Sequence, residues 1–299
     1  MNENKPAHVP VMHREVLSLF SEVVPSLLVD GTVGLGGHAE TLLNSLPISL
    51  LVGMDGDLQA LRLAGERLAG FGERVRLFHA PYCRMGHILD RLGVGKASGI
   101  LLDLGLSSLQ VDDPSRGFSF RIDGPLDMRM NQEGELTAWD VVNGYSEEDL
   151  ETIFRDYGEE RWARRIARFI VEARSESPIA STGELAEVVS RAIPRRFHSR
   201  RIHPATRTFQ AIRIEVNGEL ECLEGFLREV PRLLAPGGRV VVISFHSLED
   251  RMVKRAFREF EDAGIGVRIT KRPLVPSPEE VEENPRARSA KLRCFEVKR

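Results

Sequence analysis

The chain has 299 residues, of which 42% are hydrophobic and 28% charged, and its formal net charge is −3. These proportions exclude a disordered or fibrous chain, and the length allows roughly two domains of about 150 residues, or one large domain with an insertion. The charge excludes a polycation, yet 35 of the 41 basic residues are arginine. Codon bias or heat adaptation would explain this preference, and so would arginine's ability to read phosphates and stack on bases.

Three cysteines, Cys83, Cys222 and Cys294, lie far apart without a C-x-x-C spacing. The sequence therefore predicts neither a disulfide framework nor a zinc site, as suits a reducing cytosol. No apolar run approaches the roughly 18 residues of a membrane span, and Met1–Pro10 is polar, unlike a signal peptide. We expect a soluble cytoplasmic protein with no metal site and no membrane partner.

The first hundred residues alternate short apolar runs with helical patterns. The apolar runs are Leu27–Val29, Leu50–Met54, Val75–Phe78 and Ile100–Leu102, and the helical patterns lie near His38–Leu46, Leu58–Ala69 and Met85–Leu92. Short strands separated by helices are typical of βαβ units, whose parallel sheet is buried on both faces. This part of the chain therefore predicts an α/β fold.

The alternation ends after the fourth strand. Asp112–Gly134 is rich in Gly, Pro, Asp and Arg without periodicity, and the pattern that follows it is helical only. Ser146 with Asp149, and Ser181 with Glu184, have the spacing of capping boxes at helix starts. The sequence thus predicts helices and no strands in this region.

Strand patterning then returns. We expect a turn at Pro236–Gly238, a strand at Arg239–Phe245, a helix near Leu248–Phe260, a solvated loop at Glu279–Glu283, and a closing antiparallel pair formed by Val267–Thr270 and Leu292–Val297. The predicted architecture is an α/β domain of residues 1–109 and 218–299, interrupted by a helical insert of residues 110–217.

A glycine-rich loop, Asp30–His38 (DGTVGLGGH), joins the first predicted strand to the first helix. Gly34-x-Gly36-x-x-Ala39 matches the dinucleotide fingerprint in the strand–turn–helix context that it requires, although a tight structural turn is the alternative. Asp55 ends the second strand, where a carboxylate can accept both hydroxyls of a ribose. The coincidence of loop and acid favours nucleoside binding.

The next strand ends help to choose the cofactor, for which a dinucleotide and S-adenosylmethionine both fit. Tyr82 follows the third strand, where an adenine would lie, although a single aromatic can equally be core. The fourth strand ends in polar Asp103–Ser108, at the edge where such sheets bind ligands, and nothing nearby indicates hydride transfer. The fifth ends in Ser244–Arg251, in which Ser247 is either a helix cap or a catalytic residue.

Residues 191–213 are strongly basic and contain no acid. They hold Arg191, Arg195, Arg196, Arg200, Arg201, Arg207 and Arg213 with His198 and His203, and residues 286–299 add six basic residues. Such a run can be a solvated face. Its contrast with the acidic total charge favours a localised anionic ligand, and nucleic acid is the obvious one.

Six motifs now give the sequence a family resemblance. They are Asp30–His38 (DGTVGLGGH), Leu102–Gln110 (LDLGLSSLQ), Arg116–Met130 (RGFSFRIDGPLDMRM), His203–Arg213 (HPATRTFQAIR), Ile243–Arg251 (ISFHSLEDR) and Asn284–Arg293 (NPRARSAKLR). Together they closely resemble the MraW-type ribosomal RNA small subunit methyltransferase H family, over almost the whole chain. The resemblance implies a Rossmann-like class I methyltransferase fold with an inserted all-helical domain. It also implies a bacterial cytoplasmic enzyme that uses S-adenosyl-L-methionine to methylate N4 of one cytidine in the decoding centre of 16S ribosomal RNA, with the small subunit as partner and no DNA.

By position, the resemblance assigns cofactor contacts to Gly36, Gly37, His38, Asp55, Tyr82, Asp103 and Gln110. Gln110 has no independent support from the residues themselves. We expect Arg207, Gln210 and Arg213 to bind RNA, because they are one helical turn apart where the insert rejoins the α/β domain. The competing interpretation is that both arginines pair with insert acids such as Glu184 or Glu187.

The candidate catalytic residues are Asp103 and His246. The cytosine amine is a poor nucleophile because its lone pair is delocalised, so an acceptor near its protons would favour attack on the sulfonium methyl. Asp103 is the first candidate and a backbone carbonyl of Leu104–Ser107 the alternative. If Asp103 instead holds the methionine amino group, the acceptor must come from elsewhere, such as the Ser244–Ser247 turn that contains His246.

Two rival functions remain: an RNA-binding assembly factor without turnover, and a nicotinamide-dependent oxidoreductase.

Overall fold

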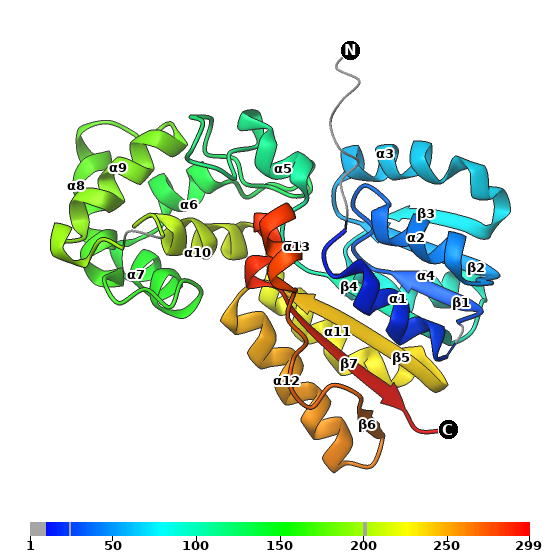
Figure 1. The fold of residues 1–299 in the computed structure, drawn as a ribbon. Coiled ribbons are helices and arrows are strands. Elements are labelled where there is room, and N and C mark those ends of the chain that lie inside the picture. The colour runs from blue at the N-terminus through cyan, green and yellow to red at the C-terminus, as the bar shows by residue number, and fades with distance from the viewer. Residues whose placement is uncertain (1–9, 24, 200–201) are drawn as a thin grey trace. The chain divides into compact units, whose positions relative to one another are not determined.

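The computed structural model describes residues 10–23, 25–199 and 202–299, so Arg200, Arg201 and nearly all of the polar N-terminus lie outside the described residues. The chain divides into two compact units, Met1–Gly105 with Glu221–Arg299, and Leu106–Leu220. The inserted unit thus begins at Leu106 rather than 110 and ends at Leu220 rather than 217. Each unit is described by itself below, with its elements labelled in Figure 1.

The first unit contains a seven-stranded sheet with strand order β3-β2-β1-β4-β5-β7-β6 (Figure 1). Its strands are β1 Leu27–Asp30, β2 Leu50–Asp55, β3 Val75–His79, β4 Ala97–Asp103, β5 Leu234–Ser244, β6 Gly266–Arg268 and β7 Lys291–Val297. Strands β1 to β5 pair in parallel, and β7 runs antiparallel to both β5 and β6. The predicted Rossmann-like α/β fold and its closing antiparallel pair are confirmed.

Helices cover both faces of this sheet, because successive strand residues point to opposite sides and both sides are apolar. One core joins Leu28, Leu51 and Leu101 to α1 (His13–Ser21), α2 (Gly37–Ser45) and α3 (Leu58–Leu68). The other core joins Val29, Val52 and Ile100 to α4 (Met85–Leu92), α11 (Glu219–Leu233) and α12 (Ser247–Asp262). Short pieces complete the unit: η1 Ala69–Arg74, η2 Tyr82–Arg84, α13 Pro278–Glu283 and η5 Pro285–Ser289.

Two local predictions in this unit are wrong. Pro236–Gly238 is not a turn before the strand but part of β5, which pairs with β4 across a register shift between Ala97 and Gly99. Glu279–Glu283 is not a loop but part of α13, because Ser277 caps the helix and its first turn is acidic. Helix α13 is also held to the start of the chain, since Glu280 Oε1 accepts a hydrogen bond of 2.6 Å from the Met12 N–H.

The cysteine prediction also needs correction. Cys83 in η2 and Cys222 in α11 form a disulfide with a Cα–Cα distance of 5.1 Å, and they are 139 residues apart in the sequence. No spacing rule could find this pair, because the fold alone brings its members together. Cys294 is a free thiol buried in β7, and burial raises its pKa to about 12.

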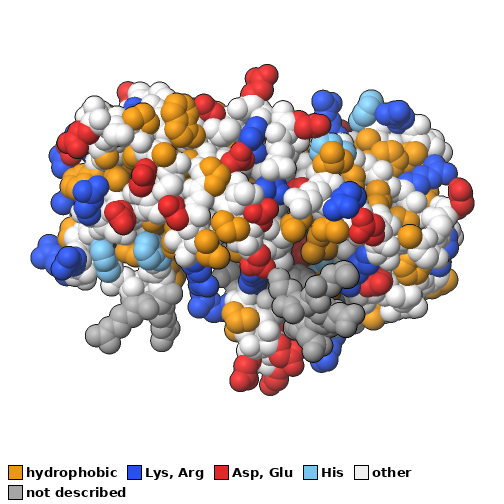
Figure 2. Space-filling view, turned by 90° about the horizontal axis from the view of Figure 1, so that it is seen from above, with side chains coloured by type: hydrophobic (Ala, Val, Ile, Leu, Met, Phe, Trp, Pro, Cys, Tyr) orange, Lys and Arg blue, Asp and Glu red, His pale blue; other side chains and the backbone are white. Residues whose placement is uncertain are grey.

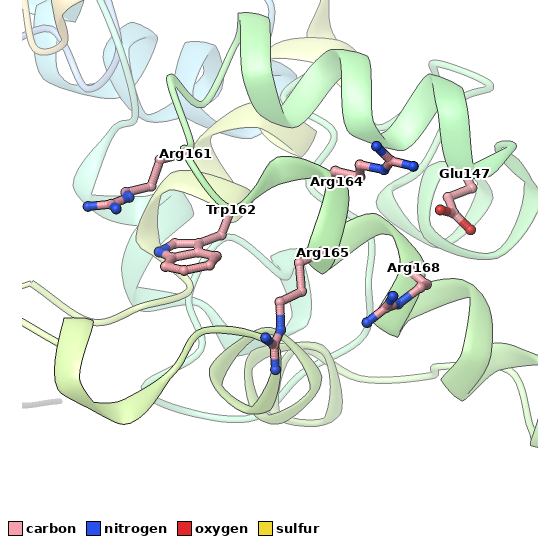
Figure 3. A pocket seen from close by; sticks show the side chains of 6 residues that line it. All are labelled: Glu147, Arg161, Trp162, Arg164, Arg165 and Arg168. Atoms are coloured by element: carbon pink, nitrogen blue, oxygen red, sulfur yellow. The ribbon is translucent and has the colours of Figure 1, made fainter.

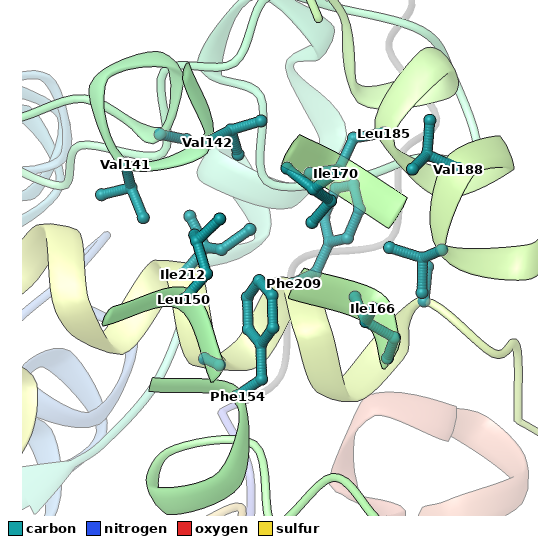
Figure 4. Packing of buried hydrophobic residues seen from close by; sticks show 14 of the residues in the cluster. Val141, Val142, Leu150, Phe154, Ile166, Ile170, Leu185, Val188, Phe209 and Ile212 are labelled. Atoms are coloured by element: carbon teal, nitrogen blue, oxygen red, sulfur yellow. The ribbon is translucent and has the colours of Figure 1, made fainter. Parts of the chain in front are cut away.

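The second unit is helical in its regular elements. It holds α5 Ser108–Asp112, η3 Pro114–Arg116, α6 Ala138–Gly144, α7 Glu147–Asp156, α8 Ala163–Glu176, α9 Thr182–Ala192, η4 Arg195–Phe197 and α10 Thr206–Asn217. Ser146 and Ser181 cap α7 and α9 as predicted. The apolar stripes of four helices meet in one core, shown in Figure 4, where Phe154, Ile166, Leu185 and Ile212 are fully buried.

Candidate functional site

The glycine loop leaves β1 at Asp30 and enters α2 at Gly37. Gly34 and Gly36 adopt φ of 51° and 80°, in the left-handed region that a side chain disfavours. Two backbone bonds fix the loop on the sheet: the Gly31 N–H donates to Leu101 O and the Val33 N–H to Met54 O. The turn itself therefore requires glycine at these two positions, and the loop lies at the tips of β1, β2 and β4.

Asp55 at the end of β2 is tied to this loop. Its carboxylate accepts hydrogen bonds of 2.8 Å from the N–H groups of Gly34 and Asp57, one on each oxygen. Burial raises the pKa of Asp55 to about 6, although these two hydrogen bonds act to lower it. Each oxygen keeps a further lone pair, so the carboxylate can hold the loop and still accept a hydroxyl. The sequence did not reveal the loop-holding role.

A second buried acid, Asp30, lies behind the loop. It is 1% exposed, and its Oδ1 accepts a hydrogen bond of 3.2 Å from the Thr32 N–H. Burial raises the pKa of Asp30 to about 7; His38 and the Thr32 N–H oppose the rise, whereas the charges of Asp103 and Asp55 add to it. The sequence pattern did not predict a role for Asp30. The feature that could have indicated one is an acid at the end of a strand that is otherwise apolar.

Asp103 and His38 face one another. His38 Nε2 lies 3.5 Å from Asp103 Oδ2, and the histidine is 7% exposed. Among the described residues, neither His38 Nε2 nor Asp103 Oδ1 has a hydrogen-bond partner, although both atoms are buried. A buried polar atom without a partner is costly, so this pair is suited to a ligand that supplies one.

The turn after β4 is held against the end of β5. The Asp103 N–H donates to Thr32 Oγ1 at 2.7 Å, and the Leu104 N–H donates to Ile243 O at 2.9 Å. Gly105 has φ of 99°, and a Cβ there would lie 3.4 Å from the Phe245 ring. The tips of β4 and β5 therefore carry Asp103 and the His246 turn next to one another.

His246, rather than Ser247, caps α12. Its side chain accepts from the Glu249 N–H, and the Glu249 carboxylate in turn accepts from the N–H groups of Phe245 and His246. His246 Nε2 also lies 3.1 Å from Glu249 Oε1, but these two atoms do not form a hydrogen bond. The interpretation of Ser247 as the cap is wrong, because a capping box can use a histidine nitrogen as acceptor.

Tyr82 packs on the core. Its ring meets Phe226 of α11 edge-on at 5.9 Å and lies beside the disulfide formed by Cys83. Tyr82 remains partly exposed, so this contact leaves open the predicted place of an adenine on its other side.

Among the described residues, no group of three or more His, Cys, Asp or Glu side chains is arranged to hold a metal ion.

The predicted residues of the insert have separate surroundings within their own unit. Gln110 is buried in α5, where its side chain closes a capping box with Ser107. Arg207 is exposed and donates to Glu159 O, and Gln210 donates to Tyr157 O. Arg213 makes a two-pronged ion pair with Glu219, at 2.7 and 2.8 Å, with its side chain 15% exposed. Arg213 thus has an acidic partner, although neither Glu184 nor Glu187 as the competing interpretation had it.

A second cluster of arginines was not predicted from the sequence. Arg161, Arg164, Arg165 and Arg168 line a hollow with Trp162 and Glu147, at the start of α8 (Figure 3). On the face drawn in Figure 2, basic and acidic side chains are interspersed, so the total charge does not reveal such local groups. The signal was the run Arg161–Arg168, in which four arginines surround apolar positions at helical spacing.

Comparison with known proteins gives consistent matches over the whole chain. The model of the MraW methylase family matches residues 5–298. The ribosomal RNA small subunit methyltransferase H of Pseudothermotoga lettingae is 50% identical over 297 residues, covering 97% of this chain and 99% of the relative. The protein of the same name from Geobacter sulfurreducens is 51% identical over 306 residues, covering 97% and 98%. A solved rRNA methylase from Streptococcus thermophilus aligns with 98% of this chain and 100% of its own at a TM-score of 0.47 and 10% identity. None of the described helices is both long and apolar enough to cross a bilayer.

Proposed function

The chain belongs to the MraW methylase family of S-adenosyl-L-methionine-dependent methyltransferases, and from this premise we propose that it methylates N4 of a cytidine in the decoding centre of small-subunit ribosomal RNA. Methylation of small-subunit ribosomal RNA is the activity in the names of relatives that share about half of its residues over nearly their full length. Family membership sets aside the nicotinamide-dependent alternative.

The observation that supports this proposal is the carboxylate cluster at the strand tips. Asp30, Asp55 and Asp103 are close enough for the charges of the other two to raise the pKa of Asp30, and Asp103 Oδ1 is buried without a partner among the described residues. Such a cluster suits a cationic ligand. These residues fit S-adenosylmethionine, whose ammonium and sulfonium groups are both cationic.

We assign the holding of the cofactor to the residues of this cluster and its loop. The backbone of Gly36 and Gly37 would line the cofactor's path, Asp55 would accept its ribose hydroxyls and Tyr82 would pack on its adenine. Asp103 and His38 would complete the site on the side of the sulfonium. When bound, the cofactor supplies an electrophilic methyl group.

The chemical task of the protein is to make the cytosine amine nucleophilic. Asp103 Oδ1 would accept a hydrogen bond from the N4 amino group, which localises the nitrogen lone pair. It would then take the proton that the nitrogen loses when the N–C bond has formed and the methyl–sulfur bond has broken, with its electron pair left on sulfur. His38, 3.5 Å from the other carboxylate oxygen, orients Asp103. His246 would close the opposite side of the target base from the tip of β5, with its ring orientation set by Glu249.

The target cytidine must leave any stack to reach this edge of the sheet, so the substrate is a single-stranded or flipped-out nucleotide. Arg207 is the best placed of the three predicted insert residues to meet RNA, because it is exposed and bonded only to a carbonyl in the described structure. Gln210 is half-buried and Arg213 is paired, so their contribution would be to hold α10 in place or to exchange partners on binding.

The test is transfer of a labelled methyl group from S-adenosylmethionine to small subunits isolated from cells that lack this protein. We expect one methyl group per subunit, recovered as N4-methylcytidine after nuclease digestion. Calorimetry with S-adenosylmethionine runs in parallel, with NAD as the control ligand. Tight cofactor binding without transfer would support an assembly factor, and transfer to another atom would contradict the N4 assignment.

A further inference from the structure

The hollow at the start of α8 has a volume of about 450 Å³, within the range of small-ligand sites. It is lined by Glu147, Arg161, Trp162, Arg164, Arg165 and Arg168, all within the inserted unit (Figure 3). We call it the arginine pocket. Four of its six lining side chains carry a permanent positive charge and one is a large aromatic.

These positive charges are not neutralised inside the protein. Within the described structure, no carboxylate forms an ion pair with Arg161, Arg164 or Arg165, and all three side chains are exposed. Arg168 has only an exposed contact of 3.4 Å with Glu172. Arg164 and Arg168 stand four residues apart in α8, where like charges destabilise a helix. The arrangement therefore lowers the stability of α8 unless an anion binds to it.

The arginine face of α8 lies outside the buried core, where Arg165 and Arg168 lie over the Phe169 ring at 5.2 and 5.8 Å from its centre. The opposite face of the helix, Ala163, Ile166, Ala167 and Ile170, is buried in the core of the insert. Exposed positions of a helix tolerate many polar residues, and four arginines with no acid between them are not needed for folding. Binding of an anionic ligand would explain this run of arginines.

Aromatic rings lie beside the charges. The guanidinium carbon of Arg161 lies 5.2 Å from the Trp162 ring centre and 4.9 Å from that of Phe197, which is 41% exposed. Arg196 lies 4.9 Å from the same Phe197 ring, so the basic segment noted in the sequence meets the pocket here. Rings and guanidinium planes together make a platform on which an unpaired base can stack.

We propose that the arginine pocket binds a single-stranded segment of ribosomal RNA at nucleotides other than the methylated one. Arg165 and Arg168 hold a phosphate, and a base stacks on the platform of Arg161, Trp162 and Phe197. The proposal rests on the proposed function, since it takes RNA as substrate. An acidic peptide would satisfy the charges but would leave the aromatic platform unused, which favours RNA.

The test uses the full-length protein with S-adenosylmethionine and RNA as substrate. The double variant Arg165→Ala/Arg168→Ala should raise KM for RNA roughly tenfold at unchanged kcat. It should also flatten the salt dependence of RNA binding, by about 0.7 in slope for each phosphate that the variant no longer neutralises. Arg161→Lys keeps the charge but not the planar stack, so it should raise KM with the salt slope unchanged.

The matched control is Arg255→Ala/Arg258→Ala on α12, two exposed arginines with the same spacing, of which Arg258 contacts Asp262 as Arg168 contacts Glu172. This control should behave as wild type, and thermal melting with cofactor calorimetry should show that all variants are folded. If wild type methylates RNA and the pocket variants match it in KM and salt slope, the pocket proposal is wrong. A loss confined to intact small subunits, with binding of protein-free RNA unchanged, would point to a protein partner and also overturn it. If wild type transfers no methyl group either to protein-free RNA or to the RNA of isolated small subunits, it is the proposed function that fails.

Discussion

His38 Nε2 lies 3.5 Å from Asp103 Oδ2, so the first turn of α2 and the tip of β4 meet in the interior of the first unit. The second carboxylate oxygen of Asp103 has no partner among the described residues. One oxygen thus lies near the protein's own histidine, and the other is left for a ligand. This division is the reason for placing the amine acceptor at Asp103.

The first prediction concerns Asp103. Asp103→Ala should lower kcat by about 10²- to 10⁴-fold, the usual worth of a positioned acid or base, with a smaller change in cofactor affinity. Single-turnover methyl transfer and calorimetry measure the two effects. Asp90→Ala, which removes an exposed carboxylate on α4, is the control. An equal loss in rate and affinity would assign Asp103 to the cofactor's amino group and leave the acceptor to the His246 turn.

The second prediction concerns Asp55. Asp55→Ala should weaken S-adenosylmethionine binding by about 1.5–3 kcal/mol, as expected for hydrogen bonds to a charged group. It should also lower the melting temperature without cofactor, because the N–H groups of Gly34 and Asp57 are then left without an acceptor. Titration calorimetry and thermal melting separate these effects. An unchanged affinity with a lowered melting temperature would leave Asp55 with a structural role only.

The third prediction is a pH dependence that arises from Asp30. Its pKa is about 7 in the folded protein against an ordinary 3.8, so between these values the folded state holds a proton that the unfolded chain has released. The free energy of unfolding should therefore fall as pH rises from about 4 to 7, by at most about 1.4 kcal/mol per pH unit from this group. Asp55, with a pKa of about 6, acts with the same sign over a lower window.

Asp30→Asn is the check, because the amide cannot titrate. Urea unfolding at pH 5, 6, 7 and 8 should show a flatter profile for the variant, most clearly between pH 5 and 6. A cationic cofactor favours the deprotonated carboxyl, so its affinity for wild type should rise over the same window and level off above it. Parallel unfolding profiles for the two proteins would show that Asp30 is ionised in the folded state across this range.

The fourth prediction distinguishes Arg207 from Arg213, which were both predicted from the sequence to bind RNA. Arg213→Ala should destabilise the protein by roughly 2–3 kcal/mol, because it removes the two charged hydrogen bonds that Arg213 donates to the largely buried Glu219 carboxylate. Arg207→Ala should leave the melting temperature unchanged and should weaken RNA binding with a smaller salt slope. Melting curves and RNA titrations at several salt concentrations give both answers. Loss of RNA affinity at a wild-type melting temperature in Arg213→Ala would reverse the two roles.

The sequence predicted the sheet well because its strands are apolar on both faces and are separated by helices with clear periodicity. It missed what depends on contacts between distant segments. The Cys83–Cys222 disulfide forms only once the fold has brought the two cysteines together. At the site, the pattern pointed to Asp55 and Asp103, but the hydrogen bonds of Asp55 to the loop and the burial of Asp30 required coordinates. The arginine pocket was missed because its charges interrupt an otherwise ordinary amphipathic helix.

The most direct test of the central claim is mass spectrometry of 16S ribosomal RNA from cells with and without the gene for this protein. The account predicts that one N4-methylated cytidine, within the decoding centre, loses that methyl group on deletion. It should regain it with the wild-type gene, but not with one encoding Asp103→Ala. An unchanged methylation pattern in the deletion strain would contradict the assignment of this chain as the N4-cytidine methyltransferase.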